Sequence, residues 1–506
     1  MAVYNRRKSI SVRVGSTAIG GTNPIRLQSM TTTATMDTEG CIEQAIRIIR
    51  AGGELVRMTT QGTREAENMR LIREGLTARG YDTPLVADVH FNPAVADVAA
   101  RYVEKVRINP GNYVDPARTF RQLEYTDQEY AQEIQRIRDR FIPFLNICRE
   151  HGTAIRIGVN HGSLSDRIMS RYGNTPAGMV ESCMEFLRIC VDQDFMNVVI
   201  SIKASNTVVM IETVRLLVKQ MDLEGMAFPI HLGVTEAGEG EDGRIKSAIG
   251  IGALLAEGIG DTIRVSLSEA PEREIPVARK LVDYAETSAQ VRVSARIENG
   301  VLSLSYNDSS LEDFQLHAAM DAGALLIDGK AKDLKLTNPN MTAAQIKSTE
   351  EAILQGARIR FSKPEYISCP GCGRTLYNLE ETIARIKAAT GHLKGVKIAI
   401  MGCIVNGPGE MADADFGYVG AGRGKISLLR RGAEAKQKKK KRKAPVVVLK
   451  DVRIFLNTVT RGLSMMNQSG VRAVCERSDT ESELVLTIRI PRREGVSARE
   501  ELQAPA

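Results

Sequence analysis

Three cysteines and a glutamate have the types and spacing of a metal-binding site. Cys369 and Cys372 form a C-x2-C pair, Cys403 follows Cys372 by 31 residues in a Gly/Pro-rich stretch, and Glu410 lies seven residues further on. Three thiolates are one ligand short of a closed four-cysteine site. The pattern predicts an iron–sulfur cluster or metal with one position held by a weaker, displaceable ligand, as a catalytic centre requires.

The alternative for these cysteines is structural zinc. Zinc of that kind needs four nitrogen or sulfur ligands, and no fourth cysteine or histidine is placed to help, since His392 falls after a predicted helix. Eight cysteines among 506 residues are too sparse for a disulfide framework. The other five lie mostly in helix-like apolar patterns and are predicted to be buried thiols: Cys41, Cys148, Cys183, Cys190 and Cys475.

Polar and charged side chains recur where short β-rich runs end. They are Arg57, Asp88, His90, Arg107, Asn109, Asn112, Arg156, Asn160, Lys203, Ser205, His231, Glu236, Arg264 and Ser266. The carboxyl ends of strands in a parallel barrel meet at one face, where the loops build the active site. Four arginines and one lysine, with only Asp88 and Glu236 as carboxylates, predict a site for a phosphate or diphosphate. For any single cation, pairing with a neighbouring carboxylate is the alternative.

Eight predicted strands position these side chains, and amphipathic helical segments separate them. The strands are Ile25–Met30, Glu54–Thr59, Pro84–His90, Lys105–Pro110, Ala154–Asn160, Asn197–Ser205, Pro229–Glu236 and Thr262–Leu267. Eight such units over about 250 residues are typical of a (β/α)8 barrel of the TIM type. A doubly wound open sheet is the alternative, but no G-x-G-x-x-G follows the first strand.

Two features of the barrel segment allow more than one interpretation. The Gly-rich stretch Ala237–Gly243, followed by Arg244 and Lys246, could cradle a phosphate or form a mobile loop. His90 and His231 could be core residues held in one tautomer or proton donors.

The segment after the barrel carries no metal or nucleophile pattern. Gln290–Ile297 and Val301–Tyr306 predict a β-hairpin, and Asp313–Gly323 and Ala343–Gly356 predict helices, with a mostly polar stretch at Lys335–Pro339 between them. We interpret this segment as a spacer domain. The cysteine segment then predicts a turn at Ser368–Gly373, a helix at Asn378–Thr390, a strand at Val396–Met401 and a loop at Gly402–Glu410.

The motifs around these residues resemble those of the 4-hydroxy-3-methylbut-2-enyl diphosphate synthases of the methylerythritol phosphate route to isoprenoids. The resemblance rests on Leu27–Thr31, Val86–Phe91, Arg107–Asn112, Arg156–Leu164, His231–Gly238, Ser247–Gly252 and both cysteine motifs. It covers about residues 5–286 and 350–428, and the segment between is similar to part of the extra domain of the longer family members, though shorter.

The resemblance implies a [4Fe–4S] cluster held by Cys369, Cys372, Cys403 and Glu410. It implies reductive ring opening and dehydration of the cyclic diphosphate of methylerythritol, with a ferredoxin or flavodoxin as electron donor. Glu236 would be the acid, with Asp88 and His90 close, and Glu410 would give way as substrate arrives. The diphosphate would lie among the conserved-motif side chains Arg57, Arg107, Arg156, Lys203 and Arg264, with Asn109, Asn112, Asn160, Ser205, His231 and Ser266 beside them.

The chain leaves the family pattern after about Leu428. A lysine-rich run follows, and the remainder weakly resembles the C-terminal end of ParB-like chromosome-partitioning proteins, with a strand at Val446–Leu449, a helix at Val452–Gly462 and a strand at Leu484–Ile490. The run at residues 436–443 supplies seven positive charges and the whole chain carries +7, so the rest is formally neutral. Any binding of nucleic acid is expected only through residues 436–443. A linker is favoured because no aromatic residues interleave with the lysines.

Composition places the chain among ordinary globular proteins, with 43% apolar and 25% charged residues. No signal-peptide pattern and no membrane-length apolar run occurs, so we expect a cytoplasmic protein without membrane contact, and we expect a homodimer. The predicted organisation is a TIM-type barrel at residues 1–286, a short α/β spacer at 287–366, a small α/β [4Fe–4S] domain at 367–432, a basic linker at 433–445 and a small α/β module at 446–506. The alternative function is a non-catalytic phosphate-binding barrel that acts as a DNA-associated or oligomerising scaffold through its tail.

Overall fold

The computed structural model describes residues 4–115, 124–288, 295–375, 377–403, 411, 414–422, 425–430, 446–449, 474–480 and 483–489. These residues fall into two compact units. The first holds the described residues of Met1–Ser362 and Ile367–Thr375, and the second holds those of Lys363–Tyr366, Leu376–Val405 and Met411–Ala506. The domain boundaries proposed from the sequence remain a prediction.

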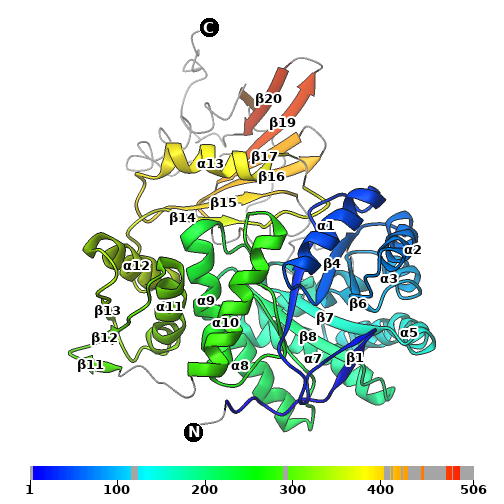
Figure 1. The fold of residues 1–506 in the computed structure, drawn as a ribbon. Helices are drawn as coiled ribbons and strands as arrows, with labels where there is room; N and C mark the ends of the chain where they lie inside the picture. The colour runs from blue at the N-terminus through cyan, green and yellow to red at the C-terminus, as the bar shows by residue number, and fades with distance from the viewer. Residues whose placement is uncertain are drawn as a thin grey trace. The chain divides into compact units, whose positions relative to one another are not determined.

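Eight parallel strands form a barrel in the first unit (Figure 1). They are β3 (Arg26–Met30), β4 (Leu55–Thr60), β5 (Leu85–Val89), β6 (Lys105–Ile108), β7 (Ala154–Asn160), β8 (Val198–Lys203), β9 (His231–Leu232) and β10 (Thr262–Ile263). Their order is β8-β7-β6-β5-β4-β3-β10-β9, and a bridge between Ile200 and Ile230 brings the two ends of the sheet together. Each strand overlaps one predicted from the sequence, so the TIM-type barrel is confirmed.

Helices follow the strands and cover the outside of the barrel. They are α1 (Thr38–Arg50), α2 (Thr63–Ala78), α3 (Pro93–Ala99), α4 (Pro110–Tyr113), α5 (Asp127–His151), α6 (Asp166–Tyr172), α7 (Pro176–Asp192), α8 (Thr207–Leu223), α9 (Gly240–Ala256) and α10 (Glu274–Ser288), with short 3-10 turns η1 (His161–Ser163) and η2 (Pro271–Arg273). Because helices cover one face and side chains fill the interior, β5 and β8 are buried at every position. The polar residues that remain inside these strands therefore need partners.

An antiparallel hairpin closes the amino-terminal end of the barrel. It consists of β1 (Val12–Val14) and β2 (Thr17–Ile19). Its apolar side chains form one buried cluster with side chains from the starts of four strands: Val12, Val14, Ile19, Leu55, Val86, Ala154 and Val199. This cluster is the apolar floor of the barrel, and the polar strand ends lie at the opposite end.

The spacer segment forms a small sheet with two helices. Its elements are β11 (Arg296–Glu298), β12 (Val301–Ser305), α11 (Leu311–Ile327), β13 (Asp333–Thr337) and α12 (Ala343–Gly356). The predicted hairpin and both helices are confirmed for their described residues. Strand β13 pairs with β12 in parallel and was missed, since Lys335–Pro339 reads as polar. Buried Leu334 and Leu336 alternate with exposed neighbours there, which is the period of a half-buried strand.

The spacer packs on the outside of the barrel within the first unit. Both α11 and α12 lie against α9 (Figure 1). A Cβ at Gly252 of α9 would lie 2.5 Å from the Met320 side chain of α11, so a glycine lets the two helices approach closely. The hydroxyl of Thr207 donates to the carbonyl of Gly356 at 2.7 Å. The spacer is therefore anchored to the barrel rather than tethered by a free linker.

The second unit is built on a mixed sheet. Its elements are β14 (Glu365–Ser368), α13 (Leu379–Thr390), β15 (Lys397–Met401), β16 (Phe416–Gly422), β17 (Lys425–Arg430), β18 (Val446–Leu449), β19 (Val474–Thr480) and β20 (Glu483–Arg489), in the strand order β14-β15-β16-β17-β19-β20-β18. The helix and the strand predicted after the C-x2-C pair are confirmed, as are the two tail strands at Val446–Leu449 and Leu484–Ile490. The helix predicted at Val452–Gly462 lies outside the described residues.

Strand β19 was not predicted from the sequence, and it connects the tail to the sheet of the second unit. It pairs with β17 on one side and with β20 on the other, both antiparallel. The tail strands thus extend the same sheet that carries β15 and β16. No helix in the described parts of the chain is long and apolar enough to cross a membrane.

Candidate active site

The carboxyl ends of the barrel strands bring the predicted cations together. Thr59 of β4 is in register with Asp88 of β5, Asp88 with Arg107 of β6, and Arg107 with Arg156 of β7. Residues in register on neighbouring parallel strands point to the same side of the sheet. Side chains far apart in the sequence therefore share one space, the interior of the barrel near its open end.

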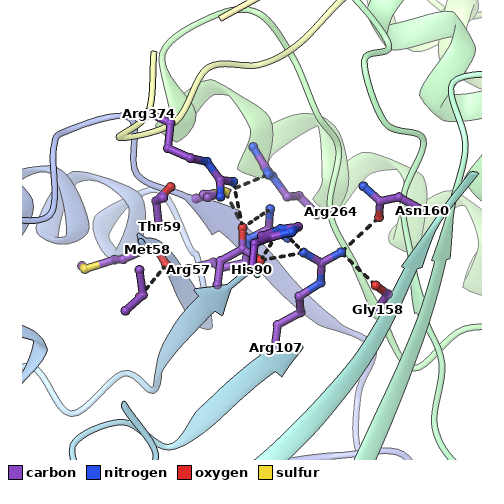
Figure 2. Close-up of polar contacts among 12 residues, drawn as sticks. Arg57, Met58, Thr59, His90, Arg107, Gly158, Asn160, Arg264 and Arg374 are labelled. Atoms are coloured by element: carbon purple, nitrogen blue, oxygen red, sulfur yellow. Dashed lines mark hydrogen bonds and ion pairs between the residues drawn. The ribbon is translucent and has the colours of Figure 1, made fainter. Parts of the chain in front are cut away.

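The carboxylate of Asp88 is the centre of this group. It lies 3.0 Å from Arg107 Nη1, 3.6 Å from Arg57 Nη2 and 3.4 Å from Arg374 Nη2. Figure 2 shows that Arg57, Arg107 and Arg374 lie close together and come from different elements. Burial raises the pKa of Asp88, but Arg57 and Arg107 outweigh burial and hold that pKa well below its usual value. Asp88 is an anion that organises cations, and at neutral pH it is not a proton donor.

The imidazole of His90 is neutral in this setting. Burial lowers its pKa well below 6.5, and the positive charge of Arg107 lowers it further. Nε2 lies against Nη1 of Arg107 and accepts from it, so the ring proton is on Nδ1, which faces the Asn112 side-chain amide at 3.2 Å. The buried Oδ1 of Asn112 has no partner among the described residues, and rotating this amide by half a turn would let Oδ1 accept the Nδ1 proton. His90 thus holds Arg107 in place.

Arg264 has a carboxylate partner that the sequence did not reveal. Its guanidinium makes two 3.0 Å hydrogen bonds to the carboxylate of Glu274, at the start of α10. The same carboxylate accepts from the hydroxyl of Ser29 at 2.6 Å. The expectation that Asp88 and Glu236 are the only carboxylates near the cations is therefore wrong, because Glu274 reaches the strand ends from the following helix.

Two further predicted cations have no carboxylate partner among the described residues. Arg156 is 1% exposed, and its Nε and Nη1 atoms lack any hydrogen-bond partner there. Lys203 is buried and makes no ion pair in the described part of the chain. Burial lowers the pKa of each side chain well below its ordinary value, and nearby cations such as Arg57 lower it further. Unpaired buried cations favour an anionic guest.

Glycines make room for two of these long side chains. A Cβ at Gly158 of β7 would lie 2.4 Å from Nε of Arg107, and one at Gly233 would lie 2.8 Å from Nζ of Lys203. Only glycine leaves space for these side chains to cross the barrel. In addition, Nη2 of Arg107 donates to the carbonyl of Gly158 at 2.9 Å.

The predicted neutral donors are also at the barrel mouth and buried. Asn160 accepts from Nη2 of Arg107 at 3.2 Å, and Asn109 donates to the hydroxyl of Ser163 at 2.8 Å. Ser205 and Ser266 are buried beyond the ends of β8 and β10. These side chains, together with Asn112, supply the hydrogen bonds that a phosphate group accepts in addition to charge.

Glu236 and His231 belong to the same segment of the barrel, since His231 lies in β9 and Glu236 follows shortly after that strand. Glu236 is buried and has φ +49°, a left-handed conformation that is uncommon for a residue with a Cβ and that concentrates at functional sites. His231 is fully buried, and its Nδ1 lies 3.3 Å from the Thr262 hydroxyl. Burial and Lys203 lower the pKa of His231 well below 6.5, so it is neutral.

The Gly-rich stretch after Glu236 leads into a helix. Gly240 is the first residue of α9, and Arg244 forms ion pairs with Glu269 at 2.6 Å and with Glu312 at 2.9 Å. Those carboxylates occupy the Arg244 guanidinium. The structure therefore favours a structural role for Arg244 over phosphate binding.

The C-x2-C segment belongs to the first unit, with the barrel. The hydroxyl of Ser268 donates to the carbonyl of Cys369 at 2.9 Å, and Ser368 forms a bridge with Ala237. Cys369 and Cys372 are half-buried. Arg374, two residues after Cys372, is the one that reaches Asp88. Sequence reasoning missed Arg374, although an arginine directly behind a metal-binding motif was a usable signal.

Of the other two predicted metal ligands, one belongs to the second unit and the other is not among the described residues. Cys403 is half-buried just after β15 in the second unit. Glu410 lies outside the described residues. Within the described residues, no group of three or more His, Cys, Asp or Glu side chains is close enough together to hold a metal ion. Cys41, Cys148, Cys183 and Cys190 are buried, as predicted.

Comparison with known proteins identifies related families over most of the chain. The model described as "GcpE TIM-barrel domain" matches residues 9–279, and "GcpE protein C-terminal domain" matches residues 365–452. A third, "Nucleoid occlusion protein C-terminal domain", matches residues 447–489, in agreement with the ParB-like resemblance of the tail.

The three curated relatives described next share one name. The 4-hydroxy-3-methylbut-2-en-1-yl diphosphate synthase (flavodoxin) of Phocaeicola vulgatus is 53% identical over 579 residues, covering 85% of this chain and 94% of that protein. The proteins of the same name from Bacteroides thetaiotaomicron and Protochlamydia amoebophila are 52% and 38% identical, each over 84% of this chain. An alignment of 579 positions exceeds the 506 residues of this chain, so the first relative contains residues that this chain lacks.

Proposed function

The chain belongs to the GcpE family of 4-hydroxy-3-methylbut-2-en-1-yl diphosphate synthases, and from this premise we propose how its residues serve that reaction. The enzyme converts 2-C-methyl-D-erythritol 2,4-cyclodiphosphate to 4-hydroxy-3-methylbut-2-enyl diphosphate, with ring opening and loss of water, in isoprenoid precursor synthesis. The observation that carries the proposal is the set of buried cations at the barrel mouth, of which two lack a carboxylate partner in the described part of the chain.

The diphosphate is held by the cations at the barrel mouth. Arg156 and Lys203 have no competing carboxylate within the described residues, so they bind it most directly. Arg57, Arg107 and Arg264 are oriented by Asp88 and Glu274, which fixes their positions before the substrate arrives. Such pre-organisation lowers the ordering cost of binding. The amide and hydroxyl donors Asn109, Asn112, Asn160, Ser205 and Ser266, with His231, complete the pocket.

The three cysteines fit an iron–sulfur cluster by their chemistry. Thiolates are the soft ligands that such clusters take. Cys369, Cys372 and Cys403 are half-buried, whereas Cys41, Cys148, Cys183 and Cys190 are packed in the core. We assign these three cysteines and Glu410 as the residues that hold a [4Fe–4S] cluster. When bound, the cluster supplies low-potential electrons one at a time and a Lewis-acidic iron.

The protons come from the chain itself. Glu236 is buried at the end of the His231–Glu236 segment, and we assign it as the acid. Asp88 remains ionised and orients Arg57 and Arg107, and His90 remains neutral and orients Arg107, so neither is assigned to deliver a proton in the resting enzyme. A flavodoxin, as the names of the relatives indicate, or a ferredoxin supplies the electrons. We further propose that the enzyme is a cytoplasmic homodimer.

Anaerobic purification tests the cluster and the reaction together. We expect a brown protein that absorbs near roughly 400 nm, as [4Fe–4S] proteins generally do, and that consumes the cyclic diphosphate with reduced flavodoxin. A colourless protein that contains zinc or no metal contradicts the proposal.

The displaceable-ligand role of Glu410 has a separate test. Glu410→Ala is expected to retain most of the cluster absorbance, because three thiolates remain, whereas Cys403→Ser loses most of it. Equal loss in both variants contradicts that role.

The tail is proposed to be a structural extension behind a basic linker. Strands β19 and β20 extend the sheet of the second unit, which deleting the tail would disrupt. Replacing the lysines of residues 438–441 by glutamine changes only the charge. Unchanged retention on DNA over a range of salt concentrations supports a linker, and a reduced salt dependence supports DNA binding.

A further inference from the structure

A buried lysine lies deeper in the barrel than the cations already described. Lys105 is 0% exposed and is the first residue of β6, two positions before Arg107. It is in register with Val86 on one side and Ala154 on the other, and both belong to the apolar floor that the hairpin of β1 and β2 closes. Lys105 therefore projects into the barrel about 6.6 Å below Arg107 along the strand.

Several buried polar atoms of the barrel strands have no partner among the described residues. They are Nζ of Lys105, both amide atoms of Gln28, Nε and Nη1 of Arg156, and Nε2 of His231. A polar atom that is removed from water without a hydrogen bond costs free energy, and a charged one costs more. Four side chains from four strands share this condition in one interior, which marks a built polar site on an otherwise apolar floor.

The charges around Lys105 all have the same sign. Burial lowers the pKa of Lys105 well below its ordinary value, and Arg156 and Arg57 lower it further. His231 feels the positive charge of Lys105, Lys203 and Arg156. The contrast with Arg107 and Arg264 is direct, because those arginines face Asp88 and Glu274. A lysine that faces only cations and neutral donors is placed to receive an anion.

We propose that Lys105 is a further anion-binding residue of this enzyme, and that its ammonium group contacts the deepest phosphate of the bound diphosphate together with Arg156 and His231. The proposal rests on the proposed position of the diphosphate at the barrel mouth. After Arg156 and His231, Lys105 supplies a third donor to that phosphate, from the closed end of the barrel. Arg57 and Arg264 approach the diphosphate from the open end. Binding draws a proton onto Lys105, since an adjacent phosphate favours the charged ammonium form.

Calorimetry with the full, cluster-loaded chain under anaerobic conditions tests this contact. Inorganic pyrophosphate and the cyclic diphosphate are the two probes. Lys105→Met keeps the length of the side chain and removes the charge, and we expect it to bind both probes about 10-fold to 100-fold more weakly, as for loss of one charge-assisted hydrogen bond. Lys347→Met, on the exposed surface of α12, is the control and is expected to bind as the wild type does.

A variant at Arg57, nearer the open end of the barrel, separates this inference from the proposed function. Arg57→Met is expected to weaken both probes. If Arg57→Met loses affinity while Lys105→Met binds as the wild type, the role of Lys105 is overturned and the substrate site stands. If Arg57→Met binds as the wild type, the substrate site itself is wrong. If Lys105→Met loses only inorganic pyrophosphate binding and keeps the cyclic diphosphate, the floor takes a separate inorganic anion, and the contact with substrate is overturned.

Two further readouts exclude a merely structural role. Without ligand, Lys105→Met is expected to melt at the same temperature as the wild type or higher, because an unpartnered buried amine is replaced by an apolar group. A lower melting temperature together with unchanged affinity identifies a structural lysine and overturns the proposal. Repeating the titration in buffers of different ionisation enthalpy measures proton uptake on binding, which is expected to be smaller in Lys105→Met. Equal uptake contradicts a proton on Lys105.

Discussion

Two sets of cations share the interior of one barrel and differ in their partners. The paired set consists of Arg57, Arg107 and Arg374 on Asp88, and Arg264 on Glu274. The unpaired set consists of Arg156, Lys203 and Lys105, which form no ion pair with a carboxylate within the described residues. Both sets are buried, so the difference lies in what compensates the cost of removing each charge from water.

The comparison teaches how a diphosphate site can be positioned and still attract its ligand. Carboxylates neutralise the paired set and fix the orientation of its guanidinium groups in the free enzyme. The unpaired set stays under-compensated until an anion arrives, so its gain on binding is larger. The paired set should thus contribute to stability, and the unpaired set should contribute to affinity at some cost in stability.

Removing the shared carboxylate is the strongest test of this division. Asp88→Asn leaves the charges of Arg57, Arg107 and Arg374 buried without their anion, and breaking a buried ion pair in this way costs about 3–5 kcal/mol. We expect the thermal midpoint of the barrel to fall by about 10 °C. Scanning calorimetry of the full chain measures it.

The matched control is an aspartate that pairs on the surface. Asp192 lies 2.7 Å from Arg138 with its side chain 54% exposed, so Asp192→Asn is expected to change stability by about 0–1 kcal/mol. Similar losses in the two variants would show that the paired set has no special role in stability.

Much of this site could be predicted from the sequence. The local pattern of strands and helices indicates a barrel, and the geometry of a barrel places the ends of its strands together. Eight alternating units place residues such as Arg57 and Lys203 at one end of the barrel without any knowledge of their contacts. The cysteine pattern likewise identifies Cys369 and Cys372 as a pair by spacing alone. These features depend on the positions of residues along elements, and the sequence contains that information.

Partners were harder to predict than positions. Glu274 lies on a helix after the last strand, and nothing in its neighbourhood marks it as the partner of Arg264. Lys105 stands at the start of a strand, where a lysine usually reaches solvent, yet it is fully buried. Strand β19 joins β17 across more than forty residues of chain. Pairings of this kind depend on tertiary packing, which local patterns do not contain.

The two histidines extend the comparison to pH, since His90 belongs with the paired set and His231 with the unpaired set. Burial lowers the pKa of both in the folded state well below 6.5. Below about pH 6.5 the unfolded chain binds protons that the folded chain does not, so stability falls as the pH falls until the folded pKa is reached. Each histidine should account for about 1 kcal/mol of lost stability between pH 7.5 and 5.5.

Unfolding midpoints at these two pH values check this expectation. His231→Gln should lose less stability on acidification than the wild type does, by about 1 kcal/mol. The exposed His151 supplies the control, because His151→Gln should follow the wild type. An acid-induced loss that is the same in all three proteins would place the titrating groups elsewhere.

Replacing Arg156 is expected to give the smallest change in stability, and this change should be a gain, whereas the changes predicted above are losses. Arg156→Met removes an unpaired buried guanidinium and keeps an unbranched apolar stem, so we expect the ligand-free enzyme to gain about 1 kcal/mol. Affinity for the cyclic diphosphate should fall about 10-fold to 100-fold at the same time. The exposed Arg70, whose side chain pairs only with Glu74 one helical turn away at 2.8 Å, is the control. Asp88→Asn and Arg156→Met both alter charges within the same barrel interior. Stability changes of opposite sign therefore cannot come from burial alone. Changes of the same sign would mean that the paired and unpaired sets do not differ in their effect on stability.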